Sequence, residues 1–331
     1  MDVLVTGGLG YIGSHTTALL HLQGHNVTVI DNLSNSTLSI LDDIDEVSGK
    51  RPRFYKVDLR DRMQLEFVTK QHPYDAIIHF AGLKSVEESI KNPLLYYENN
   101  VLGTLNLLEV MKSSEIRQII FSSSATVYGH SPQAVSEESP LAQHMTNSYA
   151  ATKKTCEEML AAFQQTIPES QVTALRYFNP VGAHQSGVLY EHITDQSTNL
   201  MPSILRALET KSPFIIHGTS YPTPDGTALR DFIHIMDLAE GHVAALHHEK
   251  PGIHMYNLGT GQKTTVLQLI RTFEKHNSVE LNLQFGPDRP GDIPISFANP
   301  SKAERELNWK ATRFLPEMVT SAYQGYLTSL K

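Results

Sequence analysis

The sequence of 331 residues has a single cysteine, Cys156, and lacks the features that mark membrane or nucleic-acid-binding proteins. One cysteine excludes an intramolecular disulfide and a CxxC metal site. No run of about 18 apolar residues occurs, so a membrane-spanning helix is not expected and no membrane partner is predicted. The net charge of −8 argues against a nucleic-acid partner, which would require a basic surface.

Patterns of several enzyme classes are missing as well. The 16 histidines include His247-His248 but no HExxH, so no metal site is expected. Segment 259–264, GTGQKT, lacks the spacing of a phosphate-binding P-loop, and no GxSxG pattern of a serine hydrolase occurs. Met1 leads directly into an apolar segment without the features of a secretory signal, which predicts a cytoplasmic protein.

The sequence does contain a regular alternation of short apolar runs and helical patterns over its first 180 residues. Such an alternation predicts an α/β fold with a doubly wound parallel sheet, covered by helices on both faces. Strands are expected at residues 3–5, 27–30, 54–57, 76–80, 119–122 and 172–177, and the clearest helices at residues 94–112 and 149–165.

This alternation ends after Asn179-Pro180, which indicates a change of domain near residue 180. We predict a first domain over residues 1–180 and a smaller C-terminal α/β lobe over residues 181–331. Segment 231–258 has the pattern of a strand, a helix and a strand that could rejoin the first sheet. Loops are expected around the prolines of the second part, namely Pro202, Pro213, Pro222, Pro224, Pro287, Pro290 and Pro294.

The first apolar run ends in a glycine-rich turn. Gly7, Gly10 and Gly13 fit GxxGxxG, and Gly8 with the last two fits GxGxxG. A helical pattern follows, so free backbone N–H groups and the positive end of a helix dipole would face a pyrophosphate. Because a strand, the turn, a helix and a second strand occur in this order, the pattern predicts a Rossmann-like dinucleotide-binding domain.

Asp31 ends the second predicted strand. A carboxylate at this position accepts hydrogen bonds from the adenosine ribose and repels a 2′-phosphate. No arginine follows within residues 32–35, so the sequence favours NAD over NADP.

Tyr149 and Lys153 stand four residues apart in the segment YAATK and would share one face of a helix. Taken alone, the pair is compatible with a solvated helix surface. Beside a nicotinamide, the tyrosine could act as a base if its pKa of about 10 fell by roughly 3 units. One cation at about 4 Å supplies on the order of 4 kcal/mol toward this, and desolvation consumes part of it. Lys153 alone is therefore marginal as an activator, whereas Lys153 together with oxidised nicotinamide is a plausible one.

Longer sequence blocks accompany these motifs. They are residues 80–84 (FAGLK), 122–129 (SSSATVYG), 176–184 (RYFNPVGAH), 199–202 (NLMP) and 306–309 (ELNW), with Asp58 after a strand. Together with the glycine-rich turn and the Tyr-Lys pair, they span residues 2–310. In this order they closely resemble the UDP-galactose 4-epimerase family of the extended short-chain dehydrogenase/reductase superfamily.

The resemblance implies a reaction and three catalytic roles. Tyr149 would take the proton of the sugar 4-hydroxyl while the C4 hydride passes to tightly bound NAD. The resulting 4-keto sugar would turn over within the site and receive the hydride on its opposite face. Lys153 would bind the nicotinamide ribose and lower the pKa of Tyr149. Ser124 would hydrogen-bond the sugar oxygen and help relay the proton.

The resemblance also implies the binding residues and a homodimer. Family members pair the helix at residues 94–112 with the Tyr-Lys helix across the dimer interface. The NAD site would comprise Gly7, Gly10, Tyr11, Ile12, Gly13, Asp31, Asn32, Asn35, Ser36, Asp58, Leu59, Phe80, Ala81, Gly82, Lys84, Asn99, Tyr149, Lys153 and Phe178. The UDP-sugar site would comprise Ser124, Tyr149, Asn179, Asn199, Leu200, His217, Arg230, Arg289, Asp292 and Ser296.

The residues before Val127-Tyr128-Gly129 distinguish between reactions of this superfamily. Related 4,6-dehydratases and decarboxylases carry a carboxylate there, and elimination of water after oxidation needs an acid and a base. This sequence has Ala125 and Thr126 instead. We therefore expect oxidation followed by reduction, without elimination.

Two positions leave the substrate open. Ser296 stands where many epimerases restricted to UDP-glucose and UDP-galactose have a tyrosine near the sugar 2-position. The space that a serine leaves gives the hypothesis that N-acetylated UDP-hexosamines are additional substrates or, as the alternative, the main ones. His217 stands where an aromatic side chain often stacks near the uracil, and an imidazole can still stack. The alternative from another class is an NAD-sensing regulator of the same fold, although such proteins commonly lose the Tyr-Lys pair.

Overall fold

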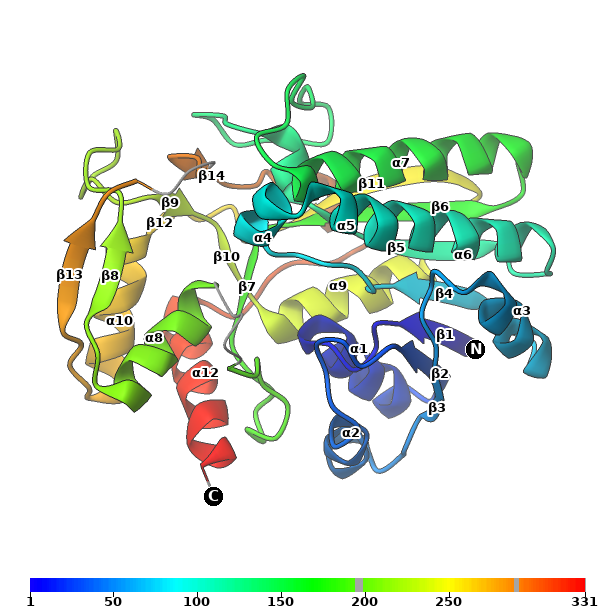
Figure 1. Cartoon of the computed structure of the whole chain (residues 1–331), viewed down its shortest axis with the longest axis horizontal. Helices are drawn as coiled ribbons and strands as arrows, with labels where there is room; N and C mark the ends of the chain where they lie inside the picture. Colours follow the sequence, from blue (N-terminus) through cyan, green and yellow to red (C-terminus); the bar gives the residue numbers. More distant parts are fainter. Residues whose placement is uncertain (194–198, 289–291, 331) are drawn as a thin grey trace.

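A seven-stranded sheet forms the centre of the protein (Figure 1). The structure, a computed structural model, describes residues 1–193, 199–288 and 292–330. Neighbouring strands of the sheet all pair in parallel. Their order is β11 (Gly252–Leu258), β6 (Gln171–Tyr177), β5 (Gln118–Ser124), β4 (Ala76–His79), β1 (Asp2–Thr6), β2 (Asn26–Asp31) and β3 (Arg53–Lys56).

Three of the middle strands contain buried apolar runs, residues 3–5 in β1, 76–78 in β4 and 119–121 in β5, because both faces of the sheet are covered. Every residue of β4, β5 and β6 is buried, and so are four of the five residues of β1. A strand of a parallel sheet that is covered on both faces is expected to be continuously apolar rather than alternating. This explains why short apolar runs predicted the strands to within a few residues.

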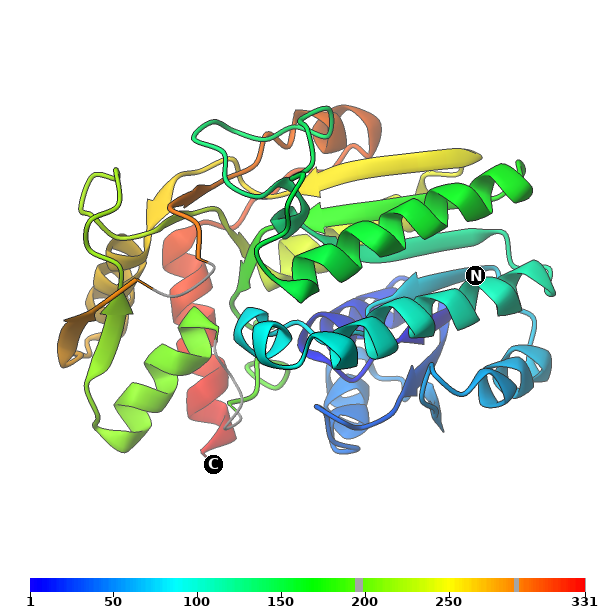
Figure 2. The same cartoon turned by 45° about the horizontal axis from the view of Figure 1, so that its top comes forward.

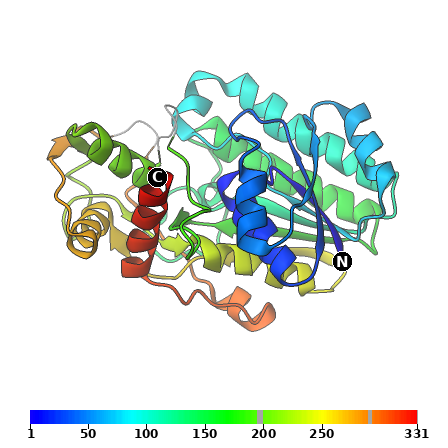
Figure 3. The same ribbon diagram turned by 90° about the horizontal axis from the view of Figure 1, so that it is seen from below.

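Helices cover the two faces of this sheet. One core cluster contains side chains of α1 (Tyr11–Leu22), α2 (Ile40–Ser48) and α9 (Ile235–His247). The other contains side chains of α3 (Arg62–Gln71), α6 (Gly103–Lys112) and α7 (Ser148–Thr166). Figure 2 shows α6 and α7 side by side over one face, and Figure 3 shows the cyan and green helices opposite α9, drawn in yellow. The predicted doubly wound α/β fold is confirmed.

The predicted helix at residues 94–112 is not uniform. After α4 (Val86–Lys91), the chain forms α5 (Pro93–Tyr96), a π-helical turn (Tyr97–Leu102) and then α6. The π-helical turn buries Asn100 against α7. Such turns inside helices often occur at functional sites.

Much of the chain after residue 180 forms a second region, which has short strands and its own core cluster. Two strand pairs are parallel: β7 (Asn179–Val181) with β10 (Phe232–His234), and β8 (Phe214–His217) with β13 (Leu283–Gly286). A third small sheet has the order β12 (Thr264–Thr265), β9 (Leu229–Arg230) and β14 (Ile295–Ser296). The helices of this region are α8 (Leu200–Thr210), α10 (Val266–Asn277) and α12 (Leu315–Ser329), whereas α11 (Ser301–Glu306) packs against β11 of the large sheet.

Two details of the second region differ from the sequence-based picture. The loop expected at Pro202 is wrong, because Pro202 is the buried third residue of α8. A proline is tolerated there, since an N–H in the first turn has no intrahelical acceptor. Segment 231–258 forms β10, α9 and β11, but only β11 joins the large sheet, whereas β10 pairs with β7. The division near residue 180 stays a prediction.

The sheet order identifies the edge where a ligand would bind. The chain proceeds from β1 outward to β3 and then returns to β4 on the other side of β1. In open α/β sheets, ligands bind outside the carboxyl ends of the strands at such a reversal. Among the described residues, no helix has the length and apolar character needed to cross a membrane.

Candidate active site

The glycine-rich turn follows β1 and is packed too tightly for side chains. Gly7 has φ +66°, in the left-handed region, and its carbonyl accepts from the Gly10 amide at 3.0 Å. A Cβ at Gly7 would lie 2.6 Å from the Ala81 amide nitrogen, and one at Gly13 would lie 2.3 Å from the Gly7 carbonyl oxygen. The turn opens directly into α1, whose first N–H groups have no intrahelical acceptor. This bare cradle fits the pyrophosphate of a dinucleotide.

Tyr11 and Ile12 begin α1 beside this turn. The Tyr11 hydroxyl donates to the Gly182 carbonyl oxygen at 2.6 Å, and burial raises the pKa of this phenol. Ile12 packs against one of the core clusters. Since the Tyr11 hydroxyl is already engaged, the backbone N–H groups are the part of this segment that can meet a ligand.

Asp31 lies beside the glycine-rich turn, at the end of β2. Its carboxylate accepts hydrogen bonds from the amides of Leu9 and Leu33, at 3.2 and 2.9 Å, and from the Ser36 hydroxyl at 2.9 Å. Asn35 is exposed in the same loop. These bonds fix the carboxylate at the position where an adenosine ribose is expected.

Asp58 follows β3 and is joined to Asn32, whose amide donates to its carboxylate at 3.0 Å. Arg60 donates twice to the same carboxylate, at 2.9 and 2.8 Å, and holds the pKa of Asp58 well below its usual range. Leu59 between them is buried. Arg60 was not predicted as part of the site. Its charge is committed to Asp58, which is consistent with the preference for NAD over NADP.

The loop at residues 80–84 is held in place by Asn100. The Asn100 side chain accepts from the Leu83 amide at 2.8 Å and donates to the Thr152 hydroxyl of α7 at 3.1 Å. The sequence analysis selected the neighbouring Asn99, which is only half-buried. The π-helical turn is what directs Asn100 inward, and a sequence pattern does not reveal such a turn.

Lys84 and Asn199 both donate to Glu191, a residue that the sequence analysis did not predict as part of the site. Glu191 accepts from the Lys84 ammonium at 3.2 Å and from the Asn199 amide at 2.8 Å. Leu200 begins α8 directly after Asn199. A residue predicted for the cofactor and one predicted for the sugar nucleotide therefore share one carboxylate partner.

Tyr149 and Lys153 lie in the first turns of α7. This helix starts where it does because the Asn147 side chain accepts from the Ala150 amide at 2.9 Å, which caps the helix. The Lys153 ammonium lies 5.9 Å from the centre of the Tyr149 ring. It donates to the Ser122 carbonyl oxygen at 2.6 Å. The two side chains thus share one helix face, as the i, i+4 spacing predicts.

Burial changes the pKa values of this pair. Burial raises the pKa of Tyr149, and a hydrogen bond with Ser124 lowers it in part. Burial lowers the pKa of Lys153 to about 8, while the nearby Cys156 and Glu157 raise it. The sequence analysis expected Lys153 to lower the pKa of Tyr149, whereas in this structure the lowering effect comes from Ser124.

Ser124 is the last residue of β5 and precedes a 3₁₀ turn (Ala125–Tyr128). Its hydroxyl oxygen accepts from the Thr126 amide at 3.3 Å and from the Thr126 hydroxyl at 3.0 Å. Phe178 packs behind this turn and is buried. The hydroxyl of Ser124 is therefore held in place by hydrogen bonds from the 3₁₀ turn that follows it.

A buried ion pair connects α7 to the sheet beneath Ser124. Arg176 of β6 donates to Glu157 of α7 through Nε and Nη2, at 2.9 and 2.6 Å, and both side chains are about 5% exposed or less. Ser123 donates to the same carboxylate at 2.5 Å, and Arg176 also donates to Tyr128 at 3.0 Å. The only sequence signal was the position of Glu157, four residues after Lys153.

Three of the predicted sugar-nucleotide residues, Arg230, Asp292 and Ser296, meet at β9. Arg230 forms an ion pair with Asp292 and stands opposite Ser296 in the pairing of β9 with β14. Arg289 lies outside the described residues. His217, at the end of β8, contacts the Pro287 carbonyl oxygen at 3.0 Å.

The glycine-containing loop at residues 259–264 binds the side chain of Asp231, the residue next to Arg230. The fully buried carboxylate of Asp231 accepts from the amides of Thr260 and Gly261, both at 2.9 Å, and from that of Ala298 at 3.0 Å. The Asp231 carbonyl oxygen accepts from the amide of Asn179, which is exposed. The glycine loop therefore binds a carboxyl group of the chain itself, and burial raises the pKa of that group.

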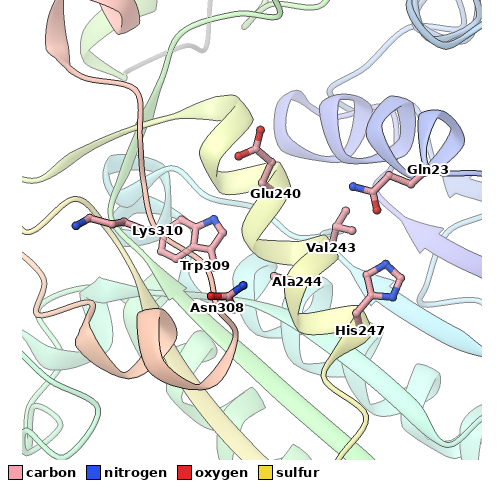
Figure 4. Close-up of a pocket in the computed structure, with 8 residues that line it drawn as sticks. All are labelled: Gln23, Glu240, Val243, Ala244, His247, Asn308, Trp309 and Lys310. Atoms are coloured by element: carbon pink, nitrogen blue, oxygen red, sulfur yellow. The ribbon is translucent and has the colours of Figure 1, made fainter.

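A separate pocket of about 330 Å³ lies between α9, the end of α1 and Asn308–Lys310 (Figure 4). Trp309 at its wall donates its indole N–H to the Asp237 carbonyl oxygen at 2.9 Å. None of the predicted site residues lines this pocket. In the part of the chain that the structure describes, no cluster of three His, Cys, Asp or Glu side chains is arranged to hold a metal ion.

Comparisons with known proteins agree with this geometry. Residues 3–259 match the NAD dependent epimerase/dehydratase family. The UDP-glucose 4-epimerase of Yersinia pestis is 46% identical over 336 residues, which cover 98% of this chain and 99% of the relative. The UDP-glucose 4-epimerase of Bacillus subtilis is 45% identical, with 98% and 96% covered.

A solved structure is similar over the whole chain. The UDP-glucose 4-epimerase of Bifidobacterium longum, in complex with NAD⁺ and UDP, superposes with a TM-score of 0.96 at 41% identity. The superposition covers 100% of this chain and 99% of the other. The fold, the motifs and these matches lead to one conclusion: the chain belongs to the NAD dependent epimerase/dehydratase family.

Proposed function

We propose that the chain is an NAD-dependent UDP-sugar 4-epimerase that interconverts UDP-glucose and UDP-galactose. The observation that carries this proposal is the meeting of Tyr149, Lys153 and Ser124 beside the glycine-rich turn, at the carboxyl ends of β1 and β5. Curated UDP-glucose 4-epimerases that are 40–47% identical over nearly the whole chain support it.

The glycine cradle is the feature that fits NAD. Because a Cβ at Gly13 would fill the turn, the backbone of α1 is open to a pyrophosphate, and Asp31 stands where the adenosine ribose would lie. The loop at residues 80–84 and Asp58 complete the proposed NAD site. When bound, NAD accepts a hydride from the sugar C4 and later returns it.

Tyr149, next to Ser124, would take and return the proton of the sugar 4-hydroxyl. The Tyr149 phenolate takes this proton as the C4–H bond breaks, so that a C4=O bond forms and a 4-keto sugar results. In the return step the Tyr149 hydroxyl gives the proton back to the sugar oxygen. The Lys153 ammonium, oriented by the Ser122 carbonyl oxygen, would bind the nicotinamide ribose.

Neither residue before Val127 can supply acid–base chemistry of a carboxylate. Ala125 has no functional group, and the Thr126 hydroxyl already donates to Ser124. Elimination after oxidation requires an acid and a base near the keto sugar. We therefore propose that oxidation is followed only by reduction.

The UDP group would bind the second region. The Arg230 guanidinium can exchange its carboxylate partner, Asp292, for a diphosphate, which planar arginine recognises well. Asn179, Asn199, Leu200, His217, Arg289 and Ser296 are the other proposed contacts. On this assignment, residues 1–180 bind NAD and also bring Ser124, Tyr149 and Asn179 to the sugar nucleotide, and residues 181–331 provide its other contacts.

Exposed apolar side chains along α5 and α6 support a homodimer. Leu94 is 81% exposed, and Tyr97, Leu102 and Leu105 are also exposed on the same helical segment. A second copy that packs this segment against its own would cover them. Analytical ultracentrifugation tests the homodimer. A cytoplasmic location is a further prediction, which cell fractionation tests.

Two alternatives are less well supported. An enzyme that acts mainly on N-acetylated UDP-hexosamines is not favoured, because curated relatives that are 44–46% identical to this chain are UDP-glucose 4-epimerases. Ser296 still leaves an additional activity on such sugars to be measured with UDP-GlcNAc. An NAD-sensing regulator would have no need for the Tyr149, Ser124 and Lys153 arrangement.

The first test is to incubate the purified protein with UDP-glucose, without added NAD, and to follow the anomeric protons by NMR. Appearance of UDP-galactose is expected, and release of NAD on denaturation would identify the retained cofactor. Bound NAD without conversion of either UDP-glucose or UDP-GlcNAc would contradict the proposal and favour the regulator.

A further inference from the structure

The hydroxyl of Ser124 has an unusual set of partners. Both hydrogen bonds that its oxygen accepts come from the same residue: the Thr126 amide at 3.3 Å and the Thr126 hydroxyl at 3.0 Å. Ser124 is buried, and Thr126 is half-buried in the 3₁₀ turn that follows β5. Thr126 thus supplies both donors that reach the Ser124 oxygen.

A serine hydroxyl has one hydrogen to donate and two positions at which to accept. Thr126 fills both accepting positions, so the only hydrogen-bonding capacity that Ser124 has left is its own O–H. Tyr149 is the partner that remains for that O–H, and its interaction with Ser124 lowers the pKa of Tyr149 against the effect of burial. The direction of this bond matters, because a donor stabilises a phenolate and an acceptor destabilises it.

Residue 126 therefore decides which way the Ser124 hydroxyl points. A valine there would keep the shape of threonine but would leave one accepting position of Ser124 empty, so that Ser124 could also accept from Tyr149. An ionised carboxylate would reverse the arrangement, since it is an acceptor only and would take the Ser124 hydrogen for itself. Threonine and serine are the side chains of this size that donate from this position.

We propose that Thr126 is a positioning residue that orients the Ser124 hydroxyl as a hydrogen-bond donor to Tyr149. This inference rests on the proposed epimerase function, because its purpose is to stabilise the phenolate that takes the sugar proton. By itself, the absence of a carboxylate at position 126 only excludes elimination. On this proposal, the threonine at that position also has a role of its own.

The test compares the variants T126V and T126S by their dependence of kcat/KM for UDP-glucose on pH. For T126V, loss of one hydrogen bond should lower kcat by about threefold to tenfold. The acidic limb of the profile should move to higher pH by about half to one pH unit, because the phenolate is less stable. Retained NAD and the KM for UDP-glucose should stay close to those of the wild type. T126S keeps the hydroxyl and should restore both the rate and the profile.

A double variant separates this role from a structural one. In an S124A background there is no hydroxyl to orient, so T126V should cause no further shift of the pH profile. An unshifted profile for T126V, an equal loss in T126S, or an additional shift in the S124A background would each overturn the role of Thr126. If T126V does not retain NAD, T126A is measured in the same way. Absence of UDP-galactose with the wild type would instead count against the proposed function.

Discussion

The proposed catalytic site at the carboxyl ends of the large sheet (the catalytic end) and the proposed UDP-binding site around β9 (the nucleotide end) differ in how far their charged side chains are buried. At the catalytic end, Lys153 is buried, and Glu157 and Arg176 are 4% and 5% exposed. At the nucleotide end, the Arg230 and Asp292 side chains are 13% and 28% exposed and are paired with each other. Glu157 and Arg176 therefore have each other as permanent partners inside the protein. Arg230 has a partner, Asp292, that a ligand can replace.

This difference follows from what each end must do. Proton transfer needs groups whose positions and pKa values are set before the substrate arrives, and a low dielectric makes fixed partners effective. A diphosphate carries its own charge and must enter from water, so its receptor has to remain accessible. The comparison makes distinct predictions about which substitutions affect kcat, stability or KM.

The largest expected effect is that of Tyr149→Phe at the catalytic end. Removal of the phenol hydroxyl removes the proposed base, so kcat should fall by about a hundredfold to ten-thousandfold, with retained NAD unchanged. Steady-state kinetics by NMR measures this. Tyr256→Phe is the matched control, because it deletes the hydroxyl of a buried tyrosine that bonds to Glu306 instead. Equal losses in both variants would contradict the assignment of Tyr149.

The second effect concerns stability. Glu157→Gln leaves the buried Arg176 guanidinium without its carboxylate, which should lower the free energy of unfolding by about 3–5 kcal/mol. Glu317→Gln in the second region removes an exposed partner of Arg313, at 3.7 Å, and should cost less than about 1 kcal/mol. Urea denaturation of the NAD-bound proteins measures both. Similar costs would show that burial does not distinguish the Glu157–Arg176 pair from an exposed one.

The third effect concerns substrate affinity. Arg230→Gln should raise the KM for UDP-glucose by about tenfold to a hundredfold, since bonds from arginine to an anion are lost, and should leave kcat nearly unchanged. Arg271→Gln is the control, because Arg271 pairs with Glu274 on the surface of α10. A fall in kcat without a rise in KM would show that Arg230 belongs to the catalytic end instead.

The smallest effect is expected from pH alone. Because burial lowers the pKa of Lys153 to about 8, its ammonium is present below that pH and is lost as the pH rises through it. The kcat should therefore decline above about pH 8, at most about tenfold per pH unit. Tyr149 titrates in the same site, so the apparent pKa values belong to the pair. A kcat that stays constant up to pH 10, with NAD still bound, would show that the charge on Lys153 is not required.

Local patterns were sufficient for several parts of the fold and the site. The strands of the large sheet up to β6, the glycine-rich turn, Asp31 and the shared face of Tyr149 and Lys153 all follow from residues that are neighbours in sequence. Hydrophobic runs, φ > 0 at Gly7 and the i, i+4 spacing act within a few residues. A sequence therefore states these features directly.

Other features depend on partners that are remote in the chain, and only the tertiary structure decided them. Glu191 joins Lys84 to Asn199, Glu157 pairs with Arg176, and Asp231 occupies the glycine loop that begins at Gly259. Glu157 and Asp231 are buried and need a specific partner, whereas Glu191 is partly exposed. In all three cases folding selects the partner by position rather than by a local pattern. The sequence by itself determined most strands of the large sheet and the spacing of the proposed catalytic pair, whereas the tertiary packing decided which charged groups have buried partners and which remain accessible to a ligand.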